Sequence, residues 1–330
     1  MRKLILLSGI LFVSLAALWA APPGRVDPPV DPARQDLNLG RADEALSALG
    51  NTLARNPDDA QAHNLRCRVY YQEEQWDPAI ADCEAAVHLA ADNSNFHLWL
   101  GRAYGLKAEH VSLVSAYKLA RKVHSEFEQA VQLDPGNADA LADLGEFDVR
   151  APGVVGGGVP HAESIVAQLQ SVNRSSALTL QARIAEAKKD YASAEADLQA
   201  AIPLAASPAD AWMDLASFYR RHDRIDDMVA AAHTGASLDR NHGPALVDGA
   251  ANLTLAGREP DTAILWLQQY VNSHAQSEIA PAFVVRAQLA QLLLRQGDVE
   301  AAQQQIAAVH ALASAYRIPS ANASAKAAGL

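Results

Sequence analysis

Residues 209–219, which read ADAWMDLASFY, decide the fold of this chain of 330 residues. Trp212, Leu215, Ala216 and Tyr219 form one stripe along a helix, because positions three and four apart lie on the same helical face. Two other stretches repeat this spacing wholly or in part: His97, Leu100, Gly101 and Tyr104, and then Leu141, Leu144 and Gly145. The recurrence at roughly 34 residues predicts the first helices of repeated units.

The second helix of each unit is predicted from small, large and small residues at intervals of four and three. This pattern occurs at Ala79, Cys83 and Ala86, at Ala194, Leu198 and Ala201, and more weakly at Ala45 and Leu49. Small side chains at a crossing let two antiparallel helices approach closely, while larger ones fill the space toward the next unit. The composition agrees, since half of the residues are hydrophobic but only 6% are aromatic. We therefore expect an all-α protein.

These stripes resemble the tetratricopeptide repeat family, whose pattern of tryptophan, leucine-glycine, tyrosine, alanine, phenylalanine, alanine and proline they follow over most of the chain. The resemblance implies a right-handed α-solenoid superhelix of about seven to eight helix-turn-helix units, filling residues 37–316. The predicted units are about 26–59, 60–93, 94–137, 138–174, 175–208, 209–242, 243–282 and 283–316. Residues 22–36 are predicted to be a proline-rich linker and residues 317–330 a flexible tail.

Residues 1–21 have the three parts of an export signal. Arg2 and Lys3 precede the apolar run from Leu4 to Leu18, and small residues follow at Ala20 and Ala21. The run is short for a membrane span, so we expect cleavage after residue 20 or 21 and a periplasmic or secreted protein. No cysteine stands at the end of the run, so the lipid-attachment pattern of lipoproteins is missing.

The net charge and the cysteine content bear on the kind of partner and on a possible disulfide. The net charge of −11 becomes −13 when Arg2 and Lys3 leave with the signal, which disfavours nucleic acid as a partner. Cys67 and Cys83 are the only cysteines. In an oxidising compartment they could form a disulfide, and the alternative is that both are small buried residues of the repeat.

Two segments depart from the repeat. The unit starting near Ser94 is about ten residues too long, which predicts a second helix lengthened to residues 111–133 that could project as a docking feature. The next unit contains the proline- and glycine-rich segment 151–160, which must be a loop. A glycine-rich turn before a helix can hold phosphate, but the phosphate-loop spacing is absent. A long unit followed by such a loop resembles a group of exported bacterial repeat proteins, including the helical subunit of some periplasmic solute transporters.

No recognisable motif supplies catalytic chemistry. The eleven histidines lack the spacing of metalloprotease ligands, and two cysteines cannot build a structural zinc site. No Gly-x-Ser-x-Gly turn exposes a nucleophile. We expect no catalytic residue, no cofactor and no metal, and therefore a binding protein rather than an enzyme.

Binding is predicted on the concave face, which the first helices of such a superhelix line. The register places seven residues there: Asn64, Arg68, Tyr71, Arg102, Arg183, Arg220 and Arg221. Arginine binds carboxylates through two parallel hydrogen bonds, so a peptide with an acidic segment or a free C-terminus would fit. The alternative is that these arginines pair with neighbouring acids such as Glu146 and Glu186.

Three functions are compatible with these features. The first is an interaction scaffold of the cell envelope that binds a protein segment in the concave groove. The second is a ligand-binding or docking component of a periplasmic transport system. The third is a chaperone-like repeat protein tethered by an uncleaved signal.

Overall fold

A computed structural model of the protein describes residues 32–319, and α-helices dominate this part of the chain. The helices follow one another as antiparallel pairs, so that each odd-numbered helix is the first of a unit and each even-numbered helix the second. Their bounds are α1 Pro32–Asn38, α2 Ala42–Arg55, α3 Ala60–Gln72, α4 Trp76–Leu89, α5 Ser94–Ala108, α6 Leu113–Leu133, α7 Ala138–Arg150, α8 Val159–Val172, α9 Arg174–Ala187, α10 Tyr191–Ala201, α11 Pro208–Arg221, α12 Ile225–Leu238, α13 Pro244–Leu255, α14 Pro260–Val271, α15 Ala282–Gln296 and α16 Val299–Leu312. Two short 3-10 turns, Gly153–Val155 and Ile202–Leu204, interrupt the connections.

The starts of five first helices, from α3 to α11, are marked by capping side chains. Asp59, Asn93, Asn137, Asn173 and Ser207 each accept a hydrogen bond from a backbone N–H in the first turn of the helix that follows. Each cap stabilises its helix by about 1 kcal/mol, because it satisfies an N–H that has no partner within the helix. The caps recur at the predicted repeat spacing, so the same local chemistry starts one unit after another.

Close approach of helices within a unit and between successive units depends on the small residues of the repeat. A Cβ atom added at Gly101 in α5 would lie 2.5 Å from the ring of Phe127 in α6, and one added at Gly145 in α7 would lie 2.4 Å from Leu180 in α9. Phe127 and Leu180 are themselves buried. The glycines therefore let these aromatic and aliphatic side chains fill the space between helices.

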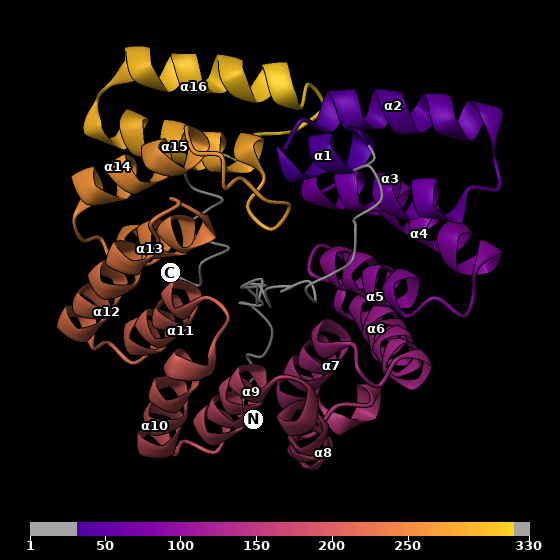
Figure 1. Ribbon diagram of the computed structural model, residues 1–330, viewed down its shortest axis with the longest axis horizontal. Coiled ribbons are helices and arrows are strands. Elements are labelled where there is room, and N and C mark those ends of the chain that lie inside the picture. The colour runs from indigo at the N-terminus through magenta and orange to yellow at the C-terminus, as the bar shows by residue number, and fades with distance from the viewer. Residues whose placement is uncertain (1–31, 320–330) are drawn as a thin grey trace, which may run out of the picture.

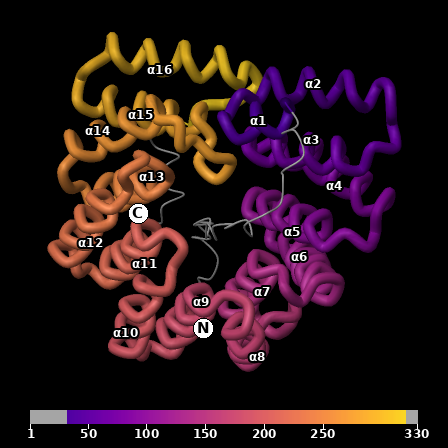
Figure 2. The backbone as a smooth tube through the Cα atoms, in the orientation of Figure 1, coloured from indigo at the N-terminus to yellow at the C-terminus, as the bar shows by residue number. Residues whose placement is uncertain are grey.

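The solenoid closes on itself, as Figure 1 and the tube in Figure 2 show. The pairs run around a ring until α15 and α16 lie beside α1 and α2. A single hydrophobic cluster joins the two ends: Leu37, Leu49 and Leu65 from the N-terminal side pack with Phe283, Val309 and Tyr316 from the C-terminal side. Two hydrogen-bonded contacts reinforce it, since the backbone N–H of Ser314 donates to Asp43 and Arg68 in α3 pairs with Glu278 in the α14–α15 connection.

Some sequence predictions differ in detail from the structure. The predicted linker ended at residue 36, but α1 already begins at Pro32, because Ala33 and Leu37 are buried against the closing end of the ring. The lengthened helix is found as α6, which runs from Leu113 rather than from Val111. The signal, residues 22–31 of the linker and the tail beyond residue 319 lie outside the described residues.

Candidate functional site

The inner face of the ring is formed by the first helices of the pairs (Figure 2). All seven residues predicted for the concave groove lie on four of these helices: Asn64, Arg68 and Tyr71 on α3, Arg102 on α5, Arg183 on α9, and Arg220 and Arg221 on α11. The structure therefore places them on the helices that the repeat register indicated. Which groups their side chains contact decides between the two alternatives given above.

The guanidinium groups on this face already have partners. Arg68 pairs with Glu278 through both its Nε and a terminal nitrogen, and Arg102 donates from Nε to Asp143 at 2.6 Å. Arg221 binds Glu186 through two hydrogen bonds of 2.8 and 2.9 Å. Arg183 lies between the carboxylates of Glu146 and Glu186, whereas Arg220 donates to the side-chain amide oxygen of Asn252. The alternative that the sequence left open therefore holds for Arg183 and Arg221, which pair with Glu146 and Glu186, and the binding of an acidic peptide in the groove stays a prediction.

The charge state of Glu186 shows how strong this pairing is. Burial alone would raise the pKa of this carboxyl group, but the hydrogen bond and charge of Arg221, with Arg183 and His222, outweigh burial and lower the pKa to about 2. Glu186 therefore stays ionised and keeps its cations. A ligand carboxylate would have to displace it.

Asn64 is buried, and Tyr71 packs in an aromatic cluster, so neither is a freely exposed side chain of the groove. Asn64 is 2% exposed, and its Nδ2 has no hydrogen-bond partner among the described residues. Tyr71 packs edge-on against Trp99 at 5.6 Å between ring centroids, and the guanidinium groups of Arg68 and Arg102 lie 4.8 and 4.7 Å from the centre of the same indole. These cation–π contacts fix the arginines in place.

Sequence reasoning missed three carboxylates on the opposite part of the inner face. Asp210 and Asp214 lie on α11, and Asp248 lies on α13. Burial first, and then the neighbouring acids, raise the pKa of Asp248 to about 8, whereas burial raises that of Asp214 to about 6 against the pull of Arg183. The signal was present in the sequence, since Asp214 and Asp248 stand 34 residues apart and hence at the same position of consecutive units.

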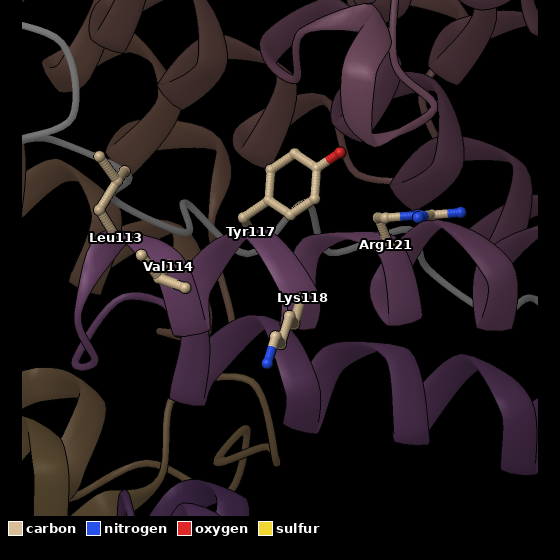
Figure 3. Close-up of a pocket in the computed structure, with 5 residues that line it drawn as sticks. All are labelled: Leu113, Val114, Tyr117, Lys118 and Arg121. Atoms are coloured by element: carbon tan, nitrogen blue, oxygen red, sulfur yellow. The ribbon is translucent and has the colours of Figure 1, made fainter.

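The start of α6 carries an exposed apolar surface. Leu113, Val114 and Tyr117 are 66%, 71% and 43% exposed, and Lys118 and Arg121 lie beside them along the same face of the helix. Figure 3 shows the five side chains, which line an open surface pocket. We call these five residues the α6 patch. Among the described residues, neither Lys118 nor Arg121 has an ion-pair partner.

The glycine-rich loop folds back onto the α6 patch. The Tyr117 hydroxyl donates to the carbonyl of Val154 at 3.0 Å, and Val154 is itself 69% exposed. The loop amides that a phosphate would need are engaged, because Val155, Gly156 and Gly158 donate to the carbonyls of Pro152, Gly153 and Asp148. The loop therefore extends an apolar surface instead of cradling an anion.

Cys67 in α3 and Cys83 in α4 are joined by a disulfide, with their Cα atoms 5.3 Å apart. Both side chains are fully buried between the two helices. The bond thus ties the two helices of one unit together beside the Trp99 cluster. The two readings of these cysteines coincide, since they are both bonded and small buried residues of the repeat.

The geometry defines a class of protein, a closed solenoid of helix pairs, and comparison with known proteins is consistent with it. Residues 33–96 match the family model of the tetratricopeptide repeat. Yeast Tom70 is similar over 87% of this chain and 61% of its own, with a TM-score of 0.52 and 13% identity. A tetratricopeptide repeat protein from Parabacteroides merdae (TM-score 0.47, 13% identity, 80% of this chain and 100% of that one) and a thermophilic one from Thermus thermophilus (0.42, 17%, 67% and 99%) also match. No curated protein sequence matches the chain.

Residues 33–96 carry the sequence pattern of the tetratricopeptide repeat family, and the described helices as a whole have the fold of a solenoid of such repeats. Proteins of this family are generally non-catalytic scaffolds that bind proteins or peptides. None of the described helices has the length and apolar character needed to cross a membrane.

Proposed function

We propose that this protein is a non-catalytic interaction scaffold of the cell envelope that docks a partner protein on the α6 patch. The observation that carries the proposal is the exposure of Leu113, Val114 and Tyr117 side by side on a helix that the repeat does not require to be so long. Grouped apolar exposure of this kind marks interaction surfaces. Lys118 and Arg121 at its border favour an apolar partner segment that carries acidic residues.

The envelope location is part of the proposal, and two features support it. Residues 1–21 have the composition of an export signal. The disulfide between Cys67 and Cys83 is a bond that persists in oxidising compartments. Mass spectrometry of the N-terminus of the protein isolated from cells tests the location, and an N-terminus at Met1 in a cytosolic fraction would contradict it.

The concave groove is the second candidate surface for the same function. It is favoured by Tyr71 and Trp99, whose partly exposed rings offer an amphipathic surface to a peptide backbone. It is disfavoured by the ion pairs that hold Arg68 and Arg102. An acidic ligand would have to break pairs that already exist, which costs desolvation and charge attraction together.

Site-specific crosslinking in intact cells separates the two surfaces. A photoreactive residue replaces Val114 in the α6 patch, Tyr71 in the groove, or Leu265, which is 50% exposed on α14 and serves as the control. We expect one protein to be captured from position 114 and not from position 265, and its capture to fall when Arg121→Glu is added. Capture from position 71 alone would move the function to the groove, and capture from neither would overturn the scaffold proposal at both surfaces.

A further inference from the structure

Three potential metal ligands meet where the chain departs from its repeat. His124 lies on the lengthened helix α6, Asp148 near the end of α7, and His161 in the first turn of α8, just after the glycine-rich loop. One ligand atom from each lies within 4.8 Å of the other two. No part of the proposed docking function uses these side chains.

Asp148 is the least satisfied member of the cluster. Its side chain is 2% exposed, and its Oδ1 accepts no hydrogen bond. A buried carboxylate oxygen without a partner is costly, so native structures pair it with a donor or with a cation. Nε2 of His124 lies 3.6 Å away, which is too far for a hydrogen bond.

This separation is longer than in the histidine–carboxylate pairs that join neighbouring helices elsewhere in the described residues. His63 with Asp82, His97 with Glu126 and His222 with Glu186 close to 2.7, 2.6 and 2.9 Å, as direct hydrogen bonds do. Two atoms that share one tetrahedral zinc ion at the usual bond lengths are instead about 3.4 Å apart. The separation of His124 and Asp148 is that of two ligands of one ion rather than of a direct bond.

The surroundings provide the outer partners that metal-binding histidines need. Nδ1 of His124 lies 3.3 Å from Glu128, one turn further along α6, and Nδ1 of His161 lies 3.0 Å from the carbonyl oxygen of Gly156. An imidazole that donates from Nδ1 presents the lone pair of Nε2 to a metal, and such acceptors fix the ring and raise its basicity. His161 is exposed, so its ring has room to turn toward the other two ligands.

The glycine-rich loop is shaped around the same three residues. Gly156 has a φ of +106°, and a Cβ atom there would lie 2.6 Å from Nδ1 of His124. The amide of Gly158 donates to the backbone carbonyl of Asp148 at 2.7 Å. Only glycine permits this backbone conformation and this close approach, which explains why the loop is rich in glycine at the cluster.

We propose that His124, Asp148 and His161 form a binding site for a first-row divalent transition metal of the zinc class. Two imidazoles and one carboxylate suit such an ion and leave at least one coordination position to water or to a group from a partner. The ion would link α6, α7 and α8 and hold the loop that presents Val154 next to the α6 patch. The proposal does not depend on the docking function.

The test measures Zn²⁺ binding to the purified full chain by isothermal titration calorimetry after chelator treatment, with Co²⁺ absorption as a second readout. We expect one ion per chain and the intense visible bands of a four- or five-coordinate Co²⁺ site. His161→Ala and Asp148→Asn should each weaken binding by about 100-fold or more, because the loss of an outer-shell partner alone costs about 10- to 100-fold. His233→Ala, which removes an exposed histidine paired with Glu259, is the matched control and should bind as the parent does.

A thermal unfolding experiment tests whether a variant loses metal binding only because it misfolds. His161→Ala alters an exposed side chain and should unfold at the same temperature as the parent without metal, whereas only the parent should gain thermal stability when Zn²⁺ is added. Binding of less than one ion per chain, or unchanged binding in both His161→Ala and Asp148→Asn, would overturn the site.

Discussion

At the scale of single residues, the disulfide between Cys67 and Cys83 makes a direct prediction. It closes a loop with a sequence separation of 16 residues, and a crosslink of that length stabilises a fold by about 3 kcal/mol, chiefly by restricting the unfolded chain. Replacing both cysteines with alanine should lower the free energy of unfolding by this order, measured by urea denaturation. The reductant dithiothreitol should destabilise the parent but leave the variant unaffected, and equal sensitivity of both would contradict the bond.

Asp248 predicts a dependence of stability on pH. Its pKa of about 8 in the folded chain lies above its ordinary value near 4, because burial and the charges of Asp210 and Asp214 disfavour ionisation. Between these pH values the folded chain binds a proton that the unfolded chain releases. The free energy of unfolding should therefore fall as the pH rises from about 4 to about 8.

The variant Asp248→Asn isolates this contribution. It should lose less stability than the parent between pH 5 and pH 8, and at pH 8 each kcal/mol gained should raise the melting temperature by about 2 °C or more. Asp226→Asn, at an exposed position of α12, is the control and should follow the parent. A pH dependence that Asp248→Asn leaves unchanged would assign the effect to other carboxyl groups.

Residue types alone could not predict the state of the inner face. The register correctly places Arg68, Arg102 and Arg183 on the first helices, since helical spacing is a local property. Their partners are not local: Glu278 lies 210 residues from Arg68, and Asp143 lies 41 residues from Arg102. The sequence analysis could name Glu146 and Glu186 as alternative partners, which Arg183 and Arg221 do contact, but it could not identify the distant partners Glu278 and Asp143.

At the scale of elements, the two glycines Gly101 and Gly50 should respond in opposite ways to the same substitution. Alanine at Gly101 places a methyl group 2.5 Å from the buried Phe127 ring, so α5 and α6 must shift apart and stability should fall by about 1–3 kcal/mol. Alanine at Gly50, inside α2, meets no atom within 4 Å and should stabilise the protein by about 0.5–1 kcal/mol. Chemical denaturation of both variants checks the signs, and destabilisation by both would show that helix propensity is not decisive at Gly50.

The helices themselves were largely predictable, because both the spacing of their apolar residues and the residues that start and end them are local features of the sequence. The caps from Asp59 to Ser207 and the small residues of each crossing indicate where helices begin and how they pair. The long helix α6 and the loop after α7 were also evident as departures. The sequence did not predict that these two departures bring His124, Asp148 and His161 together. The three residues are separated by 24 and 13 positions and match no metal-binding spacing.

At the scale of the whole molecule, closure of the ring is the property that local patterns could not reveal. It depends on how eight successive helix pairs accumulate rotation until α15 meets α1 and α2. One contact makes the meeting tight: Gly40 has a φ of +64°, and a Cβ atom there would lie 2.4 Å from the backbone nitrogen of Ala282. A solenoid with free ends would expose Phe283 and Leu37, whereas here both are buried.

The ion pair between Arg68 and Glu278 tests whether closure stabilises the fold. Both side chains are about 14% exposed, and removing one partner of such a pair leaves an uncompensated buried charge, which costs about 3 kcal/mol or more. Arg68→Glu should therefore lower the melting temperature and increase the radius of gyration in small-angle X-ray scattering as the ends separate. The reversed pair Arg68→Glu with Glu278→Arg should recover much of both losses.

The same reversed pair decides what a loss of binding in Arg68→Glu means. If the groove binds an acidic ligand through Arg68, the reversed pair restores the ring but not the positive charge on α3, so binding stays lost. If the partner docks on the α6 patch and needs only an intact ring, binding returns with the melting temperature. Crosslinking from position 114 in the single and the reversed variants distinguishes these outcomes. It measures capture of the partner, while small-angle X-ray scattering measures whether the ring is closed.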